Sequence, residues 1–244
     1  MFAFRSRSLE PLLLTGESSA FLPLSYRAHL PHCVAGTAVR PIGGWQAAAK
    51  RSTDIILALL FLALFGPMML VVAVLIPLSS AGPALFRQRR IGRDGRDFEM
   101  LKFRTMYHGR NTPAALQQAT RDDPRVTRIG ALLRRLSFDE VPQFLNVLRG
   151  EMSIVGPRPH APGTCAGGRL FEEVAHRYDA RHRVKPGVTG LAQVRGWRGE
   201  TDTEEKLLNR VASDLEYIAT WSLRLDLVII WRTLFAVLRM RNAY

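Results

Sequence analysis

The longest apolar stretch of the chain covers residues 55–78 and contains no charged residue. As a helix it would be about 36 Å long, which is enough to cross the roughly 30 Å hydrocarbon core of a bilayer. It begins too far into the chain for an ordinary N-terminal signal peptide, and no cleavage-site pattern follows it closely. The pattern therefore predicts a membrane helix that starts at Lys50, with its N-cap among residues 52–54.

The middle of this segment holds a helix-bending pair, Gly66 and Pro67. Pro67 lacks an N–H and its ring clashes with the carbonyl of Ala63, so a kink is expected there. Basic residues flank both ends, and the positive-inside rule would place both ends in the cytosol. Physical reasoning alone leaves two topologies open: a single span, or a re-entrant helix that bends at this pair and leaves on the side it entered.

Residues 85–104 alternate between apolar and charged side chains around the dipeptide Asp94-Gly95. This combination predicts a β-hairpin with its turn at that dipeptide. Side chains alternate across a strand, so Lys102 and Arg104 would share one face of the second strand. On residue pattern alone these are either solvated hairpin charges or phosphate contacts.

Helical patterns resume after a polar connector at residues 105–120. A short helix is predicted over residues 131–136, and Ser137 is the expected N-cap of the next one. Asp139 and Glu140 would then lie in a first turn, where carboxylates commonly do no more than favour the helix dipole.

Two longer helices are predicted near the C-terminus, over residues 204–219 and 222–239. The second is apolar but carries several charges, so a second membrane span is not expected. Trp221 and Trp231 suit a membrane interface and a protein core equally well, and both interpretations stay open. Together with the hairpin, these elements predict a mixed α/β fold that is mainly helical.

The 244-residue chain has a formal net charge of +13, because 34 Lys and Arg outnumber 21 Asp and Glu. This charge predicts anionic partners such as nucleic acid, acidic lipids or nucleotide-phosphate substrates. The arginines are spread over several elements and not gathered on one reading element, which argues against nucleic acid. The two cysteines, Cys33 and Cys165, form no disulfide framework, which fits a reducing, cytosolic setting.

Histidines give little support for a metal hydrolase. His176 and His182 are six residues apart, which is off the spacing that would place both on one helix face, and His160 is isolated. We expect all three to be surface or capping residues.

Candidate chemistry gathers instead at two adjacent carboxylates, Asp139 and Glu140, which follow a pair of arginines and precede a Gly-Pro-Arg-Pro turn at residues 156–159. A carboxylate is ionised at neutral pH, so it could attack phosphorus without a base to activate it. Repulsion from a phosphate would have to be relieved by nearby cations. The pattern therefore points to phosphoryl chemistry beside a membrane.

Seven ordered motifs resemble those of the bacterial sugar transferases, the monotopic phosphoglycosyl transferases that start surface-polysaccharide assembly. The motifs are Lys-Arg-x-x-Asp (50–54), Leu-Phe-Arg-Gln (85–88), Lys-Phe-Arg-Thr-Met (102–106), Asp-Pro-Arg-Val-Thr (123–127), Ser-Phe-Asp-Glu (137–140), Ser-Ile-Val-Gly-Pro-Arg-Pro (153–159) and Val-Lys-Pro-Gly-Val-Thr-Gly (184–190). The resemblance runs from residue 50 to the C-terminus, and the order of the motifs makes it specific.

The resemblance implies an enzyme that transfers a hexose-1-phosphate from a UDP-sugar to undecaprenyl phosphate and releases UMP. It further implies a covalent phospho-sugar intermediate on Asp139, with Glu140 as its partner in metal binding or proton handling and Mg²⁺ as the cofactor bound by the pair. This reaction is the first membrane step of exopolysaccharide assembly, and downstream glycosyltransferases would extend the product. A non-catalytic scaffold of the same fold is the alternative, although such a relative should have lost the acid pair or the Pro-Arg-Pro turn.

Five basic residues are candidates for binding the substrate's phosphates or nucleotide. Arg134 matches the phosphate-contacting arginine of the family, and Arg158 is presented by the Pro-Arg-Pro turn in a way that suits a nucleotide phosphate or base. Lys102, Arg104 and Arg125 are further candidates, and each could instead be a structural surface charge.

The resemblance also favours the re-entrant topology, since the membrane helix of the family is broken at a Ser-Pro pair. Here the pair is Gly66-Pro67, so the serine hydroxyl is missing. The expected organisation is a poorly ordered leader (residues 1–49), a re-entrant helix (50–82) and a catalytic domain with interfacial C-terminal helices (83–244). The catalytic domain would lie on the cytosolic face of the bacterial inner membrane.

The loop at residues 196–203 resembles that of family members that handle glucose or galactose, so one of these hexoses is the expected donor sugar. Members that use N-acetylated, amino-modified sugars commonly differ in this loop.

Overall fold

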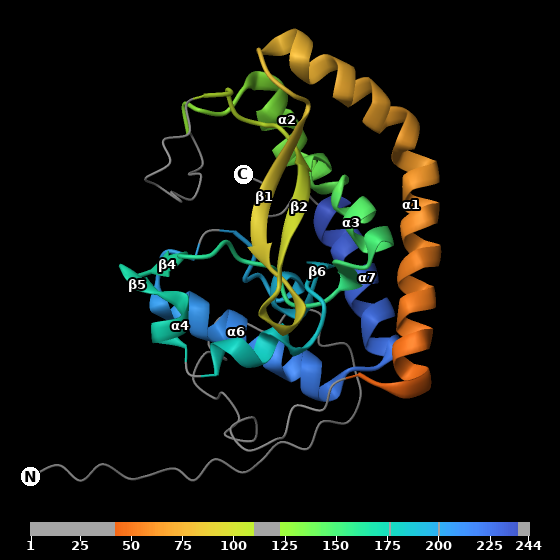
Figure 1. The fold of residues 1–244 in the computed structure, drawn as a ribbon, viewed down its shortest axis with the longest axis vertical. Coiled ribbons are helices and arrows are strands. Elements are labelled where there is room, and N and C mark those ends of the chain that lie inside the picture. Colours follow the sequence, from red (N-terminus) through yellow and green to blue (C-terminus); the bar gives the residue numbers. More distant parts are fainter. Residues whose placement is uncertain (1–41, 110–122, 176, 200, 239–244) are drawn as a thin grey trace, which may run out of the picture. The chain divides into compact units, whose positions relative to one another are not determined.

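The computed structural model describes residues 42–109, 123–175, 177–199 and 201–238. Most of the predicted leader and of the polar connector lies outside these residues. The described part is mainly helical and carries small two-stranded sheets, as predicted (Figure 1). The helices are α1 (Gly44–Ser79), α2 (Arg128–Arg135), α3 (Gln143–Arg149), α4 (Phe171–Val174), α5 (Leu191–Val194), α6 (Glu204–Thr220) and α7 (Leu223–Leu238). The strands are β1 (Leu85–Ile91), β2 (Asp97–Phe103), β3 (Ser153–Val155), β4 (Cys165–Ala166), β5 (Arg169–Leu170) and β6 (Gly187–Thr189).

Helix α1 begins at Gly44, earlier than the sequence pattern predicted. The expected N-cap among residues 52–54 is therefore wrong, because these residues lie inside the helix. Asp54 instead turns into the protein, where its Oδ1 accepts hydrogen bonds from Ser153 Oγ and Ile154 N, both at 3.0 Å. The carboxylate that looked like a cap thus fixes helix α1 to strand β3.

Both ends of α1 are fastened to the same folded domain. Near the N-terminal end, Lys50 donates to the carbonyl of Val155 at 3.1 Å and forms an ion pair with Asp226 of α7 at 2.8 Å. At the other end, the guanidinium of Arg104 uses all five of its N–H groups on the segment that follows the helix. Its acceptors are the carbonyls of Ser80, Ala81, Gly82 and Pro83 and the hydroxyl of Ser80.

Between these two attachments, α1 presents a long apolar surface. The helix continues through Gly66 and Pro67, and Figure 1 shows it bending along its length, as expected for a helix with an internal proline. Within the described residues it is the one helix long and apolar enough to cross a membrane. Its exposed large side chains are Ile56, Leu59, Leu60, Leu64, Met68, Leu70, Val71, Val74, Leu75 and Leu78.

The predicted hairpin is confirmed. Strands β1 and β2 pair antiparallel from Leu85 opposite Phe103 to Ile91 opposite Asp97. Asp94 and Gly95 in the connection have φ of 56° and 73°, the left-handed conformation that Asp-Gly dipeptides favour in hairpin turns. Strand β2 lies against α3, so the hairpin carries Lys102 toward the segment that holds the acid pair.

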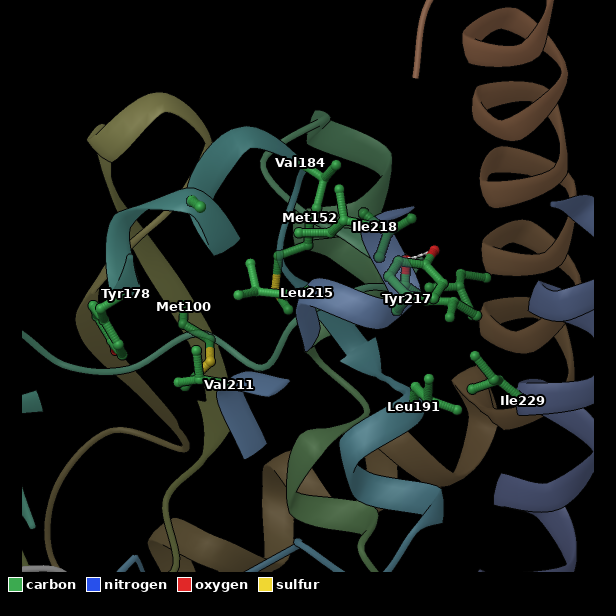
Figure 2. Close-up of a cluster of buried hydrophobic side chains, with 14 of the residues drawn as sticks. Met100, Met152, Tyr178, Val184, Leu191, Val211, Leu215, Tyr217, Ile218 and Ile229 are labelled. Atoms are coloured by element: carbon green, nitrogen blue, oxygen red, sulfur yellow. Dashed lines mark hydrogen bonds between the residues drawn. The ribbon is translucent and has the colours of Figure 1, made fainter. Parts of the chain in front are cut away.

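The apolar core lies around α6, α3 and the parallel pair β3–β6, and Figure 2 shows part of it. Both C-terminal helices occur close to where they were predicted. Helix α6 belongs to the core, since Leu207, Val211 and Leu215 are all buried. Helix α7 buries Ile229 but leaves five large apolar side chains exposed, namely Leu227, Val228, Trp231, Leu234 and Phe235.

The contacts of Arg104 predict that it stabilises the exit of α1 from the domain. Arg104→Met should lower the free energy of unfolding by about 3 kcal/mol, because it leaves several partly buried carbonyls without donors. Thermal unfolding of the detergent-solubilised protein measures this loss. Arg89→Met on the same hairpin is the control, because Arg89 is in an exposed ion pair with Asp97 and should change stability little. An Arg104→Met variant of unchanged stability but weaker phosphate binding would contradict the structural role.

Candidate functional site

The acid pair lies on a sharply turned segment between α2 and α3. Ser137 occupies the N-cap position that was predicted for it, but it has φ of 56° and its side chain makes no capping hydrogen bond. Asp139 and Glu140 lie in a 3₁₀ turn, Phe138–Glu140, and helix α3 starts only at Gln143 after Pro142. A left-handed serine costs on the order of 1–3 kcal/mol, so the surrounding structure must impose it.

Packing of Phe138 supplies part of that constraint. Its ring stacks on Phe103 of β2 with a centroid distance of 6.3 Å, and it meets Phe65 of α1 edge-on at 6.1 Å. The residue before Asp139 is thus held between the hairpin and α1. These ring contacts fix the position of the acid pair relative to α1.

Glu140 lies among three cationic side chains. Lys102 Nζ donates to its Oε1 at 3.0 Å, Arg158 contacts both of its oxygens, and Arg198 Nη2 lies 4.0 Å from Oε2. The side chain of Glu140 is only 12% exposed. Burial alone would raise the pKa of its carboxyl, but the charges of Arg158 and Lys102 hold the pKa well below its usual value. Glu140 is therefore a fixed anion.

Asp139 differs from Glu140 in its hydrogen bonding and in the direction of its pKa shift. Within the described part of the chain its carboxylate accepts no hydrogen bond, although Lys102, Arg134 and Arg158 act on it through their charges. Burial, followed by the charge of Glu140, raises the pKa of Asp139 above its usual value. A carboxylate that is more basic and has no hydrogen-bond donor attached is the better nucleophile of the two.

The structure brings three of the predicted basic residues to this pair. Lys102 and Arg158 contact Glu140 directly. Arg134, on α2, donates from Nε to Thr105 Oγ1 at 2.9 Å and acts on Asp139 through its charge. These residues come from β2, α2 and the turn after β3, so the site is assembled by the tertiary fold.

The other two predicted basic residues have different partners. All five N–H groups of Arg104 are engaged at the end of α1, as described above. Arg125 is paired with Asp123, which lowers the pKa of that carboxyl to about 2. Phosphate binding by Arg104 would require breaking the contacts that hold α1, whereas Arg125 lies near Arg134 at the edge of the group.

Sequence reasoning missed Arg198 as a site residue. Besides approaching Glu140, its Nη2 donates to Ser137 Oγ at 2.8 Å. Arg198 lies in the loop that the resemblance had linked to donor choice, and that loop was the available signal. Arg90 was missed too: its Nη1 donates to the carbonyl of Pro159 at 3.2 Å, and burial followed by the charge of Arg158 lowers its pKa to about 10.

His160 is also placed differently from the prediction. It is buried, not a surface or capping residue, and its ring lies between the guanidinium groups of Arg181 and Arg210. Burial and these two charges hold the pKa of His160 well below its usual value, so the ring is neutral. His182 is partly buried, and His176 lies outside the described residues.

The acid pair offers oxygen ligands of the kind that Mg²⁺ prefers. Within the described residues no group of three or more His, Cys, Asp or Glu side chains could hold a metal ion by itself. Mg²⁺ in phosphoryl-transfer sites is usually held by only one or two carboxylates together with substrate phosphates. Among the described residues Asp139 has oxygens free of hydrogen-bond donors, whereas both oxygens of Glu140 already accept from Lys102 or Arg158. The donor set therefore fits an ion that binds to Asp139 together with a diphosphate and shares Glu140 with these cations.

The sequence of the chain is similar to known proteins of one family. The family model described as bacterial sugar transferase matches residues 45–240. An undecaprenyl-phosphate glucose phosphotransferase of Komagataeibacter xylinus is 51% identical over 205 residues, which are 84% of this chain and 38% of the relative. A UDP-glucose:undecaprenyl-phosphate glucose-1-phosphate transferase of Escherichia coli K12 is 48% identical over 204 residues, which are 84% of this chain and 43% of the relative.

A third relative has a length closer to that of this chain. The exopolysaccharide production protein PSS of Rhizobium leguminosarum bv. phaseoli is 48% identical over 189 residues, which are 78% of this chain and 94% of the relative. The chain spans less than half the length of the first two relatives. The family match covers most of the chain and includes the acid pair, the hairpin and both long C-terminal helices. The chain therefore belongs to the bacterial sugar transferase family.

Proposed function

We propose that the protein transfers glucose-1-phosphate from UDP-glucose to undecaprenyl phosphate, through a phospho-sugar bound covalently to Asp139. The observation that carries the proposal is the difference between the surroundings of the two acids. Glu140 is held as an anion by Lys102, Arg158 and Arg198, whereas Asp139 beside it accepts no hydrogen bond among the described residues. The relatives named for glucose transfer support the reaction and the choice of donor.

The first half-reaction forms the covalent intermediate. A carboxylate oxygen of Asp139 attacks the β-phosphorus of the UDP-sugar, and the bond between that phosphorus and the oxygen bridging the two phosphates breaks. UMP leaves with the electron pair of that bond. In the second half-reaction a phosphate oxygen of undecaprenyl phosphate attacks the same phosphorus, which releases Asp139 and gives a lipid diphosphate sugar.

The cations around Glu140 explain how an anion can attack an anion. Lys102, Arg158 and Arg198 outnumber the one charge of Glu140 that they share, so the site keeps an excess of positive charge facing Asp139. This excess attracts the diphosphate and stabilises the charge that spreads over the phosphoryl oxygens in the transition state. Mg²⁺ held by Asp139, Glu140 and the diphosphate would add to that neutralisation when bound.

The attachment of α1 supports the re-entrant topology. Lys50 at one end and the segment held by Arg104 at the other both contact the domain that carries the acid pair. A straight span would carry one of these attachments to the far side of the bilayer. With the exposed face of α1 in the inner membrane, the domain lies on the cytosolic side, where UDP-sugars occur and the lipid phosphate reaches the interface.

The product of this reaction is the starting unit of a surface glycan. Downstream glycosyltransferases would consume it by adding further sugars to the lipid-linked hexose. The relative named for exopolysaccharide production supports such a role. UDP-galactose is the competing donor, because the resemblance of the loop at residues 196–203 does not separate the two hexoses.

The nucleophile is tested by UMP release from a panel of UDP-sugars, with Mg²⁺ and undecaprenyl phosphate, by the purified, detergent-solubilised protein. The wild type should release UMP with UDP-glucose, and Asp139→Asn should reduce release to background because an amide does not attack phosphorus. Asp94→Asn, in the exposed hairpin turn, is the matched control. Normal turnover by a folded Asp139→Asn variant would refute the assignment, and release with UDP-galactose alone would correct the donor.

Glu140→Gln tests the partner acid. We expect turnover to fall about 100-fold, because the cations lose the anion that orders them, and the Mg²⁺ concentration for half-maximal activity to rise. Titrating Mg²⁺ at saturating donor measures both effects. Glu216→Gln, which alters an exposed ion pair with Arg195, is the control. An unchanged Mg²⁺ requirement in Glu140→Gln would remove Glu140 from the metal site.

The topology is tested with single cysteines in a Cys33→Ser, Cys165→Ser background. Gln46→Cys and Ala81→Cys mark the two ends of α1, and both positions are exposed. In spheroplasts a membrane-impermeant maleimide should label neither position, and both should react after lysis. Labelling of one end in intact spheroplasts would show that the helix spans the bilayer.

A further inference from the structure

Two of the arginines that meet at Glu140 come from distant parts of the chain. Arg158 follows β3, and Arg198 lies in the loop between α5 and α6. Long arginine side chains have many rotamers, so holding two of them on one carboxylate requires that their backbones be fixed relative to each other. The structure shows a buried set of residues that does this.

The backbone of Arg158 is held by Arg181. The Nη2 of Arg181 donates to the carbonyl of Arg158 at 2.7 Å and to Asp214 Oδ2 at 2.7 Å. The side chains of Arg181 and Asp214 are 1% and 2% exposed. This buried ion pair therefore holds the main chain of Arg158, whose side chain contacts Glu140.

The backbone of Arg198 is held in the same manner by Arg210 of α6. Its Nε and Nη2 donate to the carbonyl of Trp197 at 3.1 and 2.8 Å, and its Nη2 also donates to the carbonyl of Gly199 at 3.0 Å. Arg210 thus forms hydrogen bonds with the main chain on both sides of Arg198.

His160 connects Arg181 to Arg210. Its Nδ1 contacts Arg181 Nη1 and lies 3.0 Å from the hydroxyl of Tyr178, and its Nε2 lies 3.0 Å from Arg210 Nη1. A neutral imidazole has one acceptor nitrogen, so His160 accepts a hydrogen bond from one of the two arginines and only packs against the other. These contacts complete a ring that runs from Glu140 through Arg158, Arg181, His160, Arg210 and Arg198 back to Glu140.

Stability alone does not explain this ring, because burying its arginines costs desolvation free energy. Among the described residues Arg210 donates to two neutral carbonyls and contacts an imidazole, while Asp214 acts on it only through its charge, although the side chain of Arg210 is buried. Burying a cation without an anion in contact carries a desolvation penalty that apolar packing would avoid. Because of this penalty, and because of the charges of Arg158 and Arg181, the pKa of Arg210 is lowered to about 10. The fork of Arg210 supplies what apolar packing cannot, which is a fixed geometry for two carbonyls.

We propose that His160, Arg181 and Arg210 are positioning residues that set the separation of Arg158 and Arg198 at the donor's diphosphate. This inference rests on the proposed function, since it assumes that both arginines act on the donor's phosphates. Loosening the ring would leave both arginines able to reach a bound diphosphate but not held at the spacing that the transition state requires. The loss should therefore fall on kcat more than on KM.

A double-mutant cycle between Arg210→Gln and Arg198→Ala tests the proposal, with UMP release from UDP-glucose as the assay. Arg210→Gln alone should lower kcat by about 10- to 100-fold and change KM for the donor by less than about threefold. In the Arg198→Ala background the same substitution should lower kcat by less than about threefold, because the side chain through which it acts is already missing. Equal fold-losses in both backgrounds would overturn the proposal.

Controls separate this inference from folding defects and from the proposed function. Arg195→Gln removes a neighbouring, exposed arginine paired with Glu216 and should change kcat by less than about twofold. If Arg210→Gln does not fold, the cycle is run with Arg210→Lys, which keeps the charge but lacks the fork, and additivity there overturns the proposal in the same way. An inactive wild type would refute the proposed function, whereas an active wild type with an additive cycle would refute only the positioning role.

Discussion

The buried carboxylate of Glu140 organises the candidate site, because three cationic side chains from three parts of the chain converge on it. Lys102 arrives on β2, Arg158 on the turn after β3, and Arg198 on the loop before α6. Without that anion the three cations would repel one another in a poorly solvated place. With it they form one group of positive charge beside Asp139, whose carboxylate accepts no hydrogen bond among the described residues.

The same arrangement places the acid pair beside the apolar helix α1. Phe138 packs between Phe65 of α1 and Phe103 of β2, so the acid pair is anchored to the helix that carries the exposed apolar face. Lys50 fastens the start of α1 to the carbonyl of Val155, three residues before Arg158. The proposed nucleophile is thus held close to the apolar helix, as a reaction with a membrane-bound acceptor would require.

Much of the fold followed from local sequence. The hairpin could be predicted because alternation and an Asp-Gly turn act over a few residues, and α6 and α7 because their apolar patterns are long. The left-handed Ser137 could not, because its conformation is imposed by the packing of Phe138 on distant elements. Asp54 looked like a helix cap by position, yet the helix begins earlier and its carboxylate serves β3.

The candidate site was predicted in part, for similar reasons. The adjacency of Asp139 and Glu140 is visible in the sequence, whereas their different surroundings are a property of the fold. Arg198 lies far along the chain from the pair, so only the tertiary structure brings it to Glu140. His160 looked isolated because its partners, Arg181 and Arg210, belong to later segments. Burial, which decides the role of a histidine, cannot be read from its neighbours in sequence.

In the proposed reaction Asp139 becomes covalently bonded to the phospho-sugar. The most direct measurement is mass spectrometry of the tryptic peptide of residues 136–149 after brief reaction with UDP-glucose, without lipid acceptor, and quenching in acid. We expect a phosphohexose adduct on this peptide that disappears when undecaprenyl phosphate is added before quenching. An unmodified peptide from protein that turns over with both substrates present would contradict the covalent route and favour direct transfer between the two substrates.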